Sequence, residues 1–464
     1  MGGFPRRGGR GPAPAADIVQ AISSLVTKMV SKFRGGGAAA ESVWGLSIES
    51  VTMVGTILSF TFLGRSLGPD GYGGYAALYA IVGPLVTLAA SGVTLSLLQH
   101  VVRDREDLEA TARSCLTLSL VLGGLLTLVG YVTATFIVEG VATVAMIAIL
   151  ATEFVTMPLV HLTATTVQAR SGFAASAPIR LVVLGARIVV LTVLYLTSTL
   201  SIMSLGLTML AVSGVAGLVF LVRVGRRYDF PFVPGRVRWH HMKSNLAYSG
   251  GISADALGNE GDKLVLAANG LVVETGLYAA AYRIVQFGLL PVGSVIQATH
   301  ARFLEHEEGL RRQHLDRALR YASLGAAYGV VFAIGISLVA PLLPIVLGDE
   351  FEESVTIVRW LSPIVLLRAV GSCSINGLMG LSKVTLRTIL LAINAAMAMV
   401  LYIVLIPRYG WEGAAIGTLV GEVLSVVMTW TALVVCQRAA DRELPVIDDD
   451  ADRAEHAADA SEEL

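Results

Sequence analysis

Ten charged side chains interrupt the long apolar stretches of this chain of 464 residues. A charged group is costly in apolar surroundings, so such residues face a protein interior or a hydrated cavity and are candidates for function. Arginine and lysine could hold an anion such as a phosphate, whereas aspartate and glutamate could bind a hard cation or exchange a proton. The ten residues are Glu49, Glu153, Arg187, Asp255, Glu260, Asp262, Lys263, Arg283, Arg368 and Glu422.

Three of these residues are arginines well inside the stretches: Arg187, Arg283 and Arg368. We expect them to bind an anionic headgroup, because a planar guanidinium can give a phosphate two parallel hydrogen bonds. A structural role is also open for Arg283, which follows Asp262 by one helical hairpin and could pair with it. The sequence therefore predicts an anion site or a structural ion pair at Arg283.

Acidic and amide side chains form a second candidate set. Asp255 and Asn259 are four residues apart, which places both on one face of a helix. Asn394 would add an oxygen ligand if the fold brings it near, and Glu49 is the candidate in the first half of the chain. Oxygen ligands suit Na⁺, and a protonatable carboxylate suits H⁺, so these residues could couple an ion gradient to function. Each could instead accept a hydrogen bond or pair with an arginine.

Motifs of common enzyme classes are missing from the sequence. It contains no P-loop, no H-E-x-x-H, no G-x-S-x-G and no dinucleotide-binding fingerprint. Cys115, Cys373 and Cys436 lie far apart in apolar stretches, without the spacing of a metal site or a disulfide framework. We therefore expect no ATP hydrolysis, no enzymatic activity and no metal or other cofactor apart from a coupling Na⁺ or H⁺.

The composition indicates the environment that must position these charges. Hydrophobic residues make up 54% of the chain and charged residues only 15%, with a mean hydropathy of +0.70. A soluble domain usually has about 25% charged residues, so much of this surface faces something other than water. The net charge of -1 gives no argument for a nucleic-acid partner. The sequence therefore predicts an all-α integral membrane protein.

About twelve apolar runs are long enough to cross a bilayer, which takes about 20 residues each. The most polar of them, 245–268, carries four charged residues and is the least certain span. The expected spans are 44–64, 75–98, 114–137, 141–162, 177–197, 202–223, 245–268, 275–298, 321–347, 356–379, 386–406 and 412–436.

Lysine and arginine accumulate in alternate loops of this scheme. The loops after the second, fourth, sixth, eighth and tenth spans are basic, whereas the opposite loops hold little beyond Arg65 and Arg408. Because basic loops remain on the cytoplasmic side, both termini are expected to be cytoplasmic in a multi-pass protein of the cell membrane.

A repeat divides the chain into two halves. Six of nine residues are identical between 73–81 and 276–284, at an offset of 203 residues and six spans. Because six is even, both copies enter the membrane from the same side, which predicts parallel lobes around a central cavity. The expected divisions are a disordered and amphipathic leader (1–43), an N-lobe (44–223), a basic linker (224–244), a C-lobe (245–436) and an acidic tail (437–464).

Four elements resemble a known family. The segment 65–75 resembles the R-x-L-G-P-x-x-[FY]-G-x-Y element of the oligosaccharide flippases in the multidrug/oligosaccharidyl-lipid/polysaccharide (MOP) superfamily, and segments 262–283, 347–351 and 410–415 resemble its later elements. The resemblance implies twelve helices in two six-helix lobes that alternate between inward- and outward-open states. We expect the glycines of the first element to allow a tight extracellular turn with positive φ, so its residues are architectural. They are Arg65, Gly68, Pro69, Tyr72, Gly73 and Tyr75.

The resemblance implies a flippase that translocates lipid-carrier-linked oligosaccharide for surface polysaccharide or glycoprotein assembly. Its expected partners are a polyprenyl or dolichyl (di)phosphate-linked oligosaccharide, membrane lipids and membrane proteins of glycan assembly. A cation-coupled multidrug exporter of the same superfamily is the first alternative, although the buried arginines favour an anionic cargo. A membrane glycosyltransferase or polymerase is the second, and the short external loops of the scheme argue against it.

Overall fold

A computed structural model describes residues 38–138, 140–304, 314–381 and 383–443, and these are helical with short connections and no strand. Most of the predicted leader and tail lies outside the described residues. The first helices are α2 (Ala38–Ala89), α3 (Ser91–Leu98), α4 (Leu108–Ile137), α5 (Thr143–Ala151), α6 (Met157–Ser171), α7 (Phe173–Leu196) and α8 (Ile202–Tyr228). The later ones are α9 (Trp239–Ala268), α10 (Val272–Leu304), α11 (His314–Val339), α12 (Leu343–Leu347), α13 (Glu352–Leu361), α14 (Pro363–Gly380) and α15 (Val384–Glu443).

Eight helical stretches in the described part of the chain are long and apolar enough to cross a membrane. Two of these, Val43–Arg103 and Thr385–Ala439, are unusually long. Each joins two helices across a kink, at Gly68 in the first and at Gly410 in the second. Helix α9, which contains the polar span 245–268, does not meet the apolar criterion. The all-α membrane fold is confirmed, and the count of twelve crossings stays a prediction.

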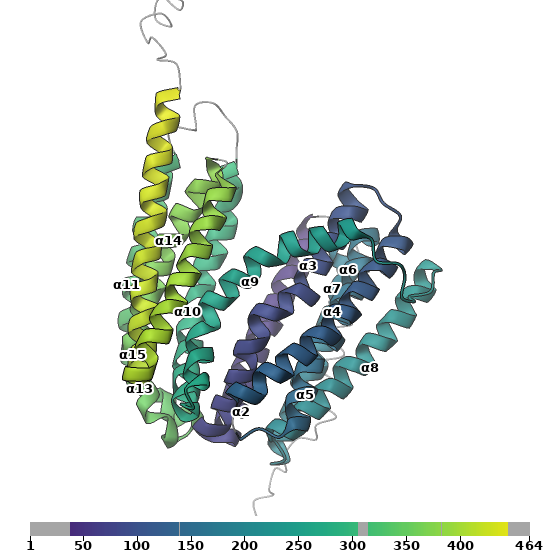
Figure 1. Ribbon diagram of the computed structural model, residues 1–464, viewed down its shortest axis with the longest axis horizontal. Coiled ribbons are helices and arrows are strands. Elements are labelled where there is room, and N and C mark those ends of the chain that lie inside the picture. The colour runs from purple at the N-terminus through teal and green to yellow at the C-terminus, as the bar shows by residue number, and fades with distance from the viewer. Residues whose placement is uncertain (1–37, 139, 305–313, 382, 444–464) are drawn as a thin grey trace, which may run out of the picture.

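Figure 1 shows the helices in two bundles, α2–α8 and α10–α15, with α9 running between them. Helix α9 packs against α2 and α3 on one side and against α15 on the other. The bundles meet at one end, where α2 contacts α10, and diverge at the other. The largest apolar core lies across this junction and combines Tyr72 of α2 with Tyr278 and Tyr282 of α10.

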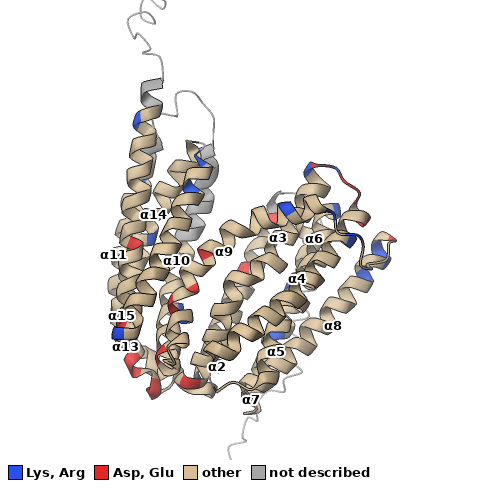
Figure 2. Cartoon of the chain, in the orientation of Figure 1, with Lys and Arg blue, Asp and Glu red and all other residues tan. Residues whose placement is uncertain are grey.

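Charge differs between the two ends of the molecule. Figure 2 shows lysines and arginines gathered where the bundles diverge, and acidic residues where they meet. The basic residues belong to the loops predicted to be cytoplasmic, such as Arg226 and Arg227 at the end of α8. The bundles therefore diverge at the end that the sequence predicts to be cytoplasmic and meet at the end predicted to be outside.

The junction is built from the two copies of the repeat. A Cβ atom on Gly73 would collide with the carbonyl oxygen of Val272, and one on Gly276 would collide with that of Pro69. Gly73 and Gly276 are equivalent positions at the offset of 203 residues. The backbones of α2 and α10 therefore approach more closely than any residue with a side chain would allow.

The element 65–75 was expected to contain a tight turn with several glycines at positive φ, and this is wrong in detail. Only Gly68 has positive φ, at 62°, and the helix continues beyond it. Arg65 donates hydrogen bonds of 2.7 Å to the carbonyl oxygens of Val346 and Ile345 in α12. The element is a kinked helix with close contacts to the second bundle. Its other glycines allow close helix packing and do not form a turn.

Candidate functional site

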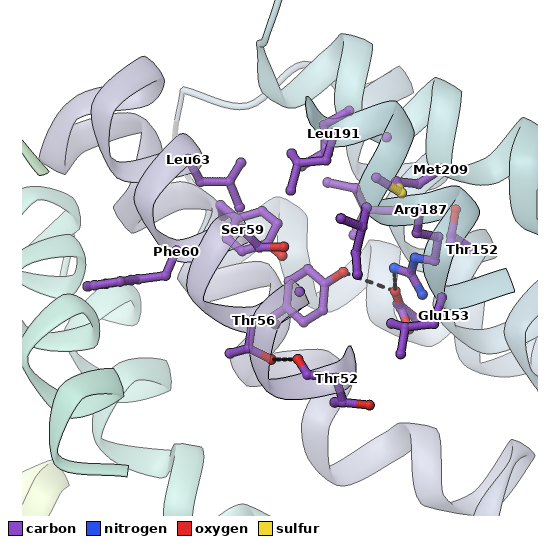
Figure 3. A pocket seen from close by; sticks show the side chains of 18 of the residues that line it. Thr52, Thr56, Ser59, Phe60, Leu63, Thr152, Glu153, Arg187, Leu191 and Met209 are labelled. Atoms are coloured by element: carbon purple, nitrogen blue, oxygen red, sulfur yellow. Dashed lines mark hydrogen bonds and ion pairs between the residues drawn. The ribbon is translucent and has the colours of Figure 1, made fainter. Parts of the chain in front are cut away.

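A cavity of about 300 Å³, here called the N-cavity, lies within the first bundle. Helix α2 contributes Thr52, Thr56 and Ser59, and the facing wall contains Glu153 and Arg187 (Figure 3). Hydroxyl groups and charges thus line a space whose remaining walls are apolar.

The charged wall of the N-cavity is held by an ion pair between two elements. Arg187 of α7 donates from Nη2 to Oε1 of Glu153 at 2.7 Å, and the Tyr79 hydroxyl donates to the same oxygen at 3.0 Å. Glu153 lies in a π-helical turn, Thr152–Thr156, between α5 and α6. Such wide turns often occur at functional sites, because they redirect a side chain out of the regular helical register.

Arg283 of α10 completes the N-cavity from the second bundle. Tyr72 of α2 lines the same cavity. Tyr72, Tyr75 and Tyr79 follow one face of α2, with successive ring centroids 6.1 and 4.6 Å apart. In the part of the chain that the structure describes, no carboxylate forms an ion pair with Arg283.

A second cavity of about 220 Å³, here called the C-cavity, lies within the second bundle and α9. Arg368 of α14 donates from Nε to Oε1 of Glu422 in α15 at 2.6 Å. The predicted set Asp255, Asn259 and Asn394 lines the same cavity. Oxygen ligands from α9 and α15 that are far apart in sequence are therefore brought together.

The predicted oxygen ligands leave bonding capacity in the C-cavity. The Asn259 Nδ2 atom donates to Oδ2 of Asp255 at 3.3 Å. The Asn394 Oδ1 atom is buried without a hydrogen-bond partner among the described residues. A buried unpaired oxygen is unfavourable by about 1–3 kcal/mol, so a bound cation or water would stabilise it.

The predicted pair of Asp262 with Arg283 is wrong. Asp262 is buried and accepts from Lys263, whose Nζ lies 3.2 Å from Asp262 Oδ1 and 3.0 Å from Glu260 Oε2. Lys263 also lies over the ring of Tyr282, 4.1 Å from its centroid. The spacing of one hairpin suggested the partner, but the side chain of Arg283 turns to the N-cavity instead.

Glu49, the predicted coupling residue of the first half, lies outside both cavities. It is exposed on α2, about one turn before Thr52, where the lining of the N-cavity begins. The acidic residue that faces the N-cavity is Glu153. It was among the ten charged residues within the apolar stretches, but sequence spacing gave no reason to prefer it over Glu49.

The family model described as "Polysaccharide biosynthesis protein" matches residues 39–300, which is more than half of the chain. The chain belongs to this family. No match was found among curated proteins.

Solved structures with the same fold are transporters. The chain is similar to an inward-facing multidrug resistance MATE family transporter of the MOP superfamily, with a TM-score of 0.65 and 16% identity over 83% of this chain and 95% of that one. An outward-facing MATE structure gives a TM-score of 0.57 at 16% identity over 89% and 99%. The lipid II flippase MurJ, in an inward closed conformation, gives 0.62 at 13% identity over 84% and 87%.

This member of the polysaccharide biosynthesis family therefore shares its fold with a MATE transporter of the MOP superfamily and with the lipid II flippase MurJ. The shared fold does not distinguish a multidrug substrate from a lipid-linked one. The substrate is therefore inferred from the cavities.

Proposed function

We propose that this protein translocates a lipid-carrier-linked oligosaccharide across the cell membrane by alternating access, for surface polysaccharide or glycoprotein assembly. The carrier would be a polyprenyl or dolichyl (di)phosphate. The observation that carries the proposal is Arg283, a cation in the N-cavity with no carboxylate in ion-pair contact among the described residues. An anionic headgroup would supply the missing charge.

The composition of the N-cavity supports an anionic cargo. Its lining contains two arginines and one glutamate, and Arg187 is already paired with that glutamate. The hydroxyls of Thr52, Thr56 and Ser59 could bond further phosphate or sugar oxygens. A volume of about 300 Å³ is at the lower end of ligand pockets, so it suits a headgroup, with lipid and glycan extending outside it.

Arg368 was expected to share in headgroup binding, and we now propose a different role for it. It lies in the C-cavity, paired with Glu422. There it fixes one carboxylate beside Asp255, Asn259 and Asn394, which we propose as the site of a coupling Na⁺ or H⁺. The unpaired Asn394 oxygen supports this assignment.

Translocation in proteoliposomes tests the cargo directly. The purified protein would be reconstituted with a fluorescent polyprenyl-diphosphate-linked oligosaccharide, with and without Na⁺ and pH gradients. We expect protein-dependent translocation of this lipid and no transport of a cationic dye. Dye export without lipid translocation would establish the multidrug alternative and refute the proposal. If neither the Na⁺ gradient nor the pH gradient changes the rate of lipid translocation, ion coupling is refuted but the proposed cargo is not.

A further inference from the structure

Four potential metal ligands meet outside both cavities. His100, Glu106, His240 and His241, here called the histidine cluster, each offer an atom, and these atoms lie within 4.8 Å of one another. His100 lies in a π-helical turn that continues α3, Glu106 in the loop before α4, and the two other histidines in the first turn of α9. The cluster thus joins the first bundle to the start of α9, at the basic end of the molecule.

The separations between the ligand atoms fit a small tetrahedral ion. Glu106 Oε1 lies 3.2 Å from His100 Nδ1 and 3.0 Å from His240 Nε2, and Glu106 Oε2 lies 3.2 Å from His241 Nε2. Zinc binds histidine nitrogen and carboxylate oxygen at about 2.0–2.2 Å, which places neighbouring tetrahedral ligands about 3.3 Å apart. The separations between Glu106 and each histidine are close to this value, and all four ligand atoms lie within 4.8 Å of one another.

The two buried histidines are oriented by hydroxyl groups behind them. His100 Nε2 lies 3.1 Å from Ser244 Oγ, and His241 Nδ1 lies 2.8 Å from Ser114 Oγ. If each hydroxyl accepts the imidazole N–H, His100 Nδ1 and His241 Nε2 present their lone pairs to the centre of the cluster. Metal-binding histidines are held in this way, with the second nitrogen donating to an outer partner.

One ligand atom in the cluster has unsatisfied bonding capacity. His100 Nδ1 is buried, and despite its closeness to Glu106 and Asp104 it makes no hydrogen bond of acceptable geometry with a described residue. A metal ion would be the partner that this nitrogen lacks.

From this geometry we propose that the histidine cluster binds a divalent transition-metal ion, with Zn²⁺ as the best fit. Three histidine nitrogens and one carboxylate are ligands of the kind that Zn²⁺ takes, and hard ions such as Mg²⁺ favour oxygen instead. The ion would fasten the first turn of α9 to the end of α3. Since α9 is the helix between the two bundles, this would restrain its N-terminal segment during any movement of the bundles.

One cation already competes for the carboxylate. Arg238 Nη1 donates to Glu106 Oε2 at 2.8 Å, the oxygen that also faces His241. Removing Arg238 should therefore free a ligand oxygen and strengthen metal binding.

The test uses untagged, chelator-stripped full-length protein in detergent. Binding of Co²⁺ would be followed by its visible absorption, and Zn²⁺ would then displace it. We expect one tight site per chain with the intense absorption of tetrahedral Co²⁺. Glu106→Gln and His240→Ala should each weaken it at least about tenfold, and Ser114→Ala by about 10- to 100-fold. His240 is half-exposed, so its replacement is not expected to disturb folding.

Two arginine variants separate a metal site from a plain ion-pair network. Arg238→Gln should strengthen Co²⁺ binding several-fold, whereas Arg236→Gln, which removes the same charge from an exposed position two residues earlier, should change it little. Zn²⁺ should also slow hydrogen exchange of amides 104–107 and 239–244 in the original protein but not in Glu106→Gln. The proposal would be refuted if Co²⁺ binding were not saturable. It would also be refuted if Glu106→Gln and His240→Ala bound Co²⁺ as tightly as the unmodified protein.

Discussion

The N-cavity and the C-cavity each contain one arginine paired with one glutamate, but different charges remain beside that pair. Arg187 and Glu153 lie 2.7 Å apart in the first, and Arg368 and Glu422 lie 2.6 Å apart in the second. The N-cavity adds a cation, Arg283, and the C-cavity adds an anion, Asp255. The pairs cancel, so the unpaired residue gives each cavity its net charge.

The comparison separates structural from ligand-binding charge. A paired charge in a membrane interior fixes two helices to each other, and removing one partner leaves the other uncompensated. A charge beside the pair is available to a mobile ligand of opposite sign. In our proposal, the N-cavity therefore takes the anionic headgroup and the C-cavity takes the coupling cation.

Loss of Arg283 should have the largest effect. Hydrogen bonds to charged groups contribute about 1.5–3 kcal/mol, so we expect Arg283→Ala to reduce lipid-linked oligosaccharide translocation by about 10- to 100-fold, with partial recovery in Arg283→Lys. The measurement is the initial rate in proteoliposomes at matched protein content. Arg408→Ala, at an exposed position, is the control and should be unchanged. A normal rate in Arg283→Ala would remove the N-cavity from headgroup binding.

The ion pairs should behave alike in both cavities. Breaking a buried pair costs about 3–5 kcal/mol, and the partial exposure of Arg187 and Glu153, at 21% and 14%, reduces this to about 1–3 kcal/mol. We expect Arg187→Met to lower the apparent Tm, and the double change with Glu153→Met to recover much of the loss.

The same cycle at Arg368 and Glu422 tests whether the two pairs are equivalent, since their exposures are similar at 21% and 17%. Thermal unfolding in detergent provides the measurement for both. A double variant no more stable than the worse single variant would show that the paired charges act independently.

Replacement of Asp255 should affect the ion dependence and leave the cargo site intact. Asp255→Asn removes the negative charge beside the Arg368–Glu422 pair, so we expect about a tenfold weaker response to Na⁺ or to the pH gradient. Binding of a polyprenyl diphosphate should remain unchanged. Asp349→Asn, exposed at the other end of the second bundle, is the matched control. An equal loss of lipid binding in Asp255→Asn would contradict the division between the cavities.

The smallest effect is expected from the repeat glycine that joins the bundles. In Gly276→Ala the new Cβ would meet the Pro69 carbonyl oxygen, which should separate the joined end and bring the diverging ends closer. The measurement is the distribution of distances between spin labels at positions 170 and 438, in a background without the native cysteines. The ratio of short to long distances should rise several-fold. Gly335→Ala, where a Cβ meets nothing within 4 Å, should leave the distribution unchanged.

Much of the fold could be predicted because length and polarity act locally. Apolar runs of about 20 residues indicated membrane helices, and the polar composition of 245–268 marked it as the least certain span. Helix α9 is indeed not among the eight stretches that are apolar enough to cross a membrane. The kinks at Gly68 and Gly410 were harder to predict from the sequence. A helix that continues past a glycine with positive φ has the same sequence pattern as two helices joined by a turn.

The site was predicted as residue types and only partly as contacts. Asp255 and Asn259 are one helical turn apart, so their common face follows from the sequence, whereas Asn394 joins them through packing of α15 on α9. The predicted partner of Asp262, Arg283, was wrong because Lys263 was an equally possible cation. Sequence spacing does not show which of the two side chains points toward Asp262. The histidine cluster gave no signal, since His100 and His240 are far apart in sequence.

The sequence by itself determined that this chain is a helical membrane protein with charged residues within its spans and a repeat at an offset of 203 residues. These properties depend on composition and on spacing along the chain. The tertiary structure alone decided which charges neutralise each other, which ones remain for a ligand, and that the two repeat glycines meet. Those outcomes depend on ångström-scale contacts between helices far apart in the chain, which no local pattern encodes.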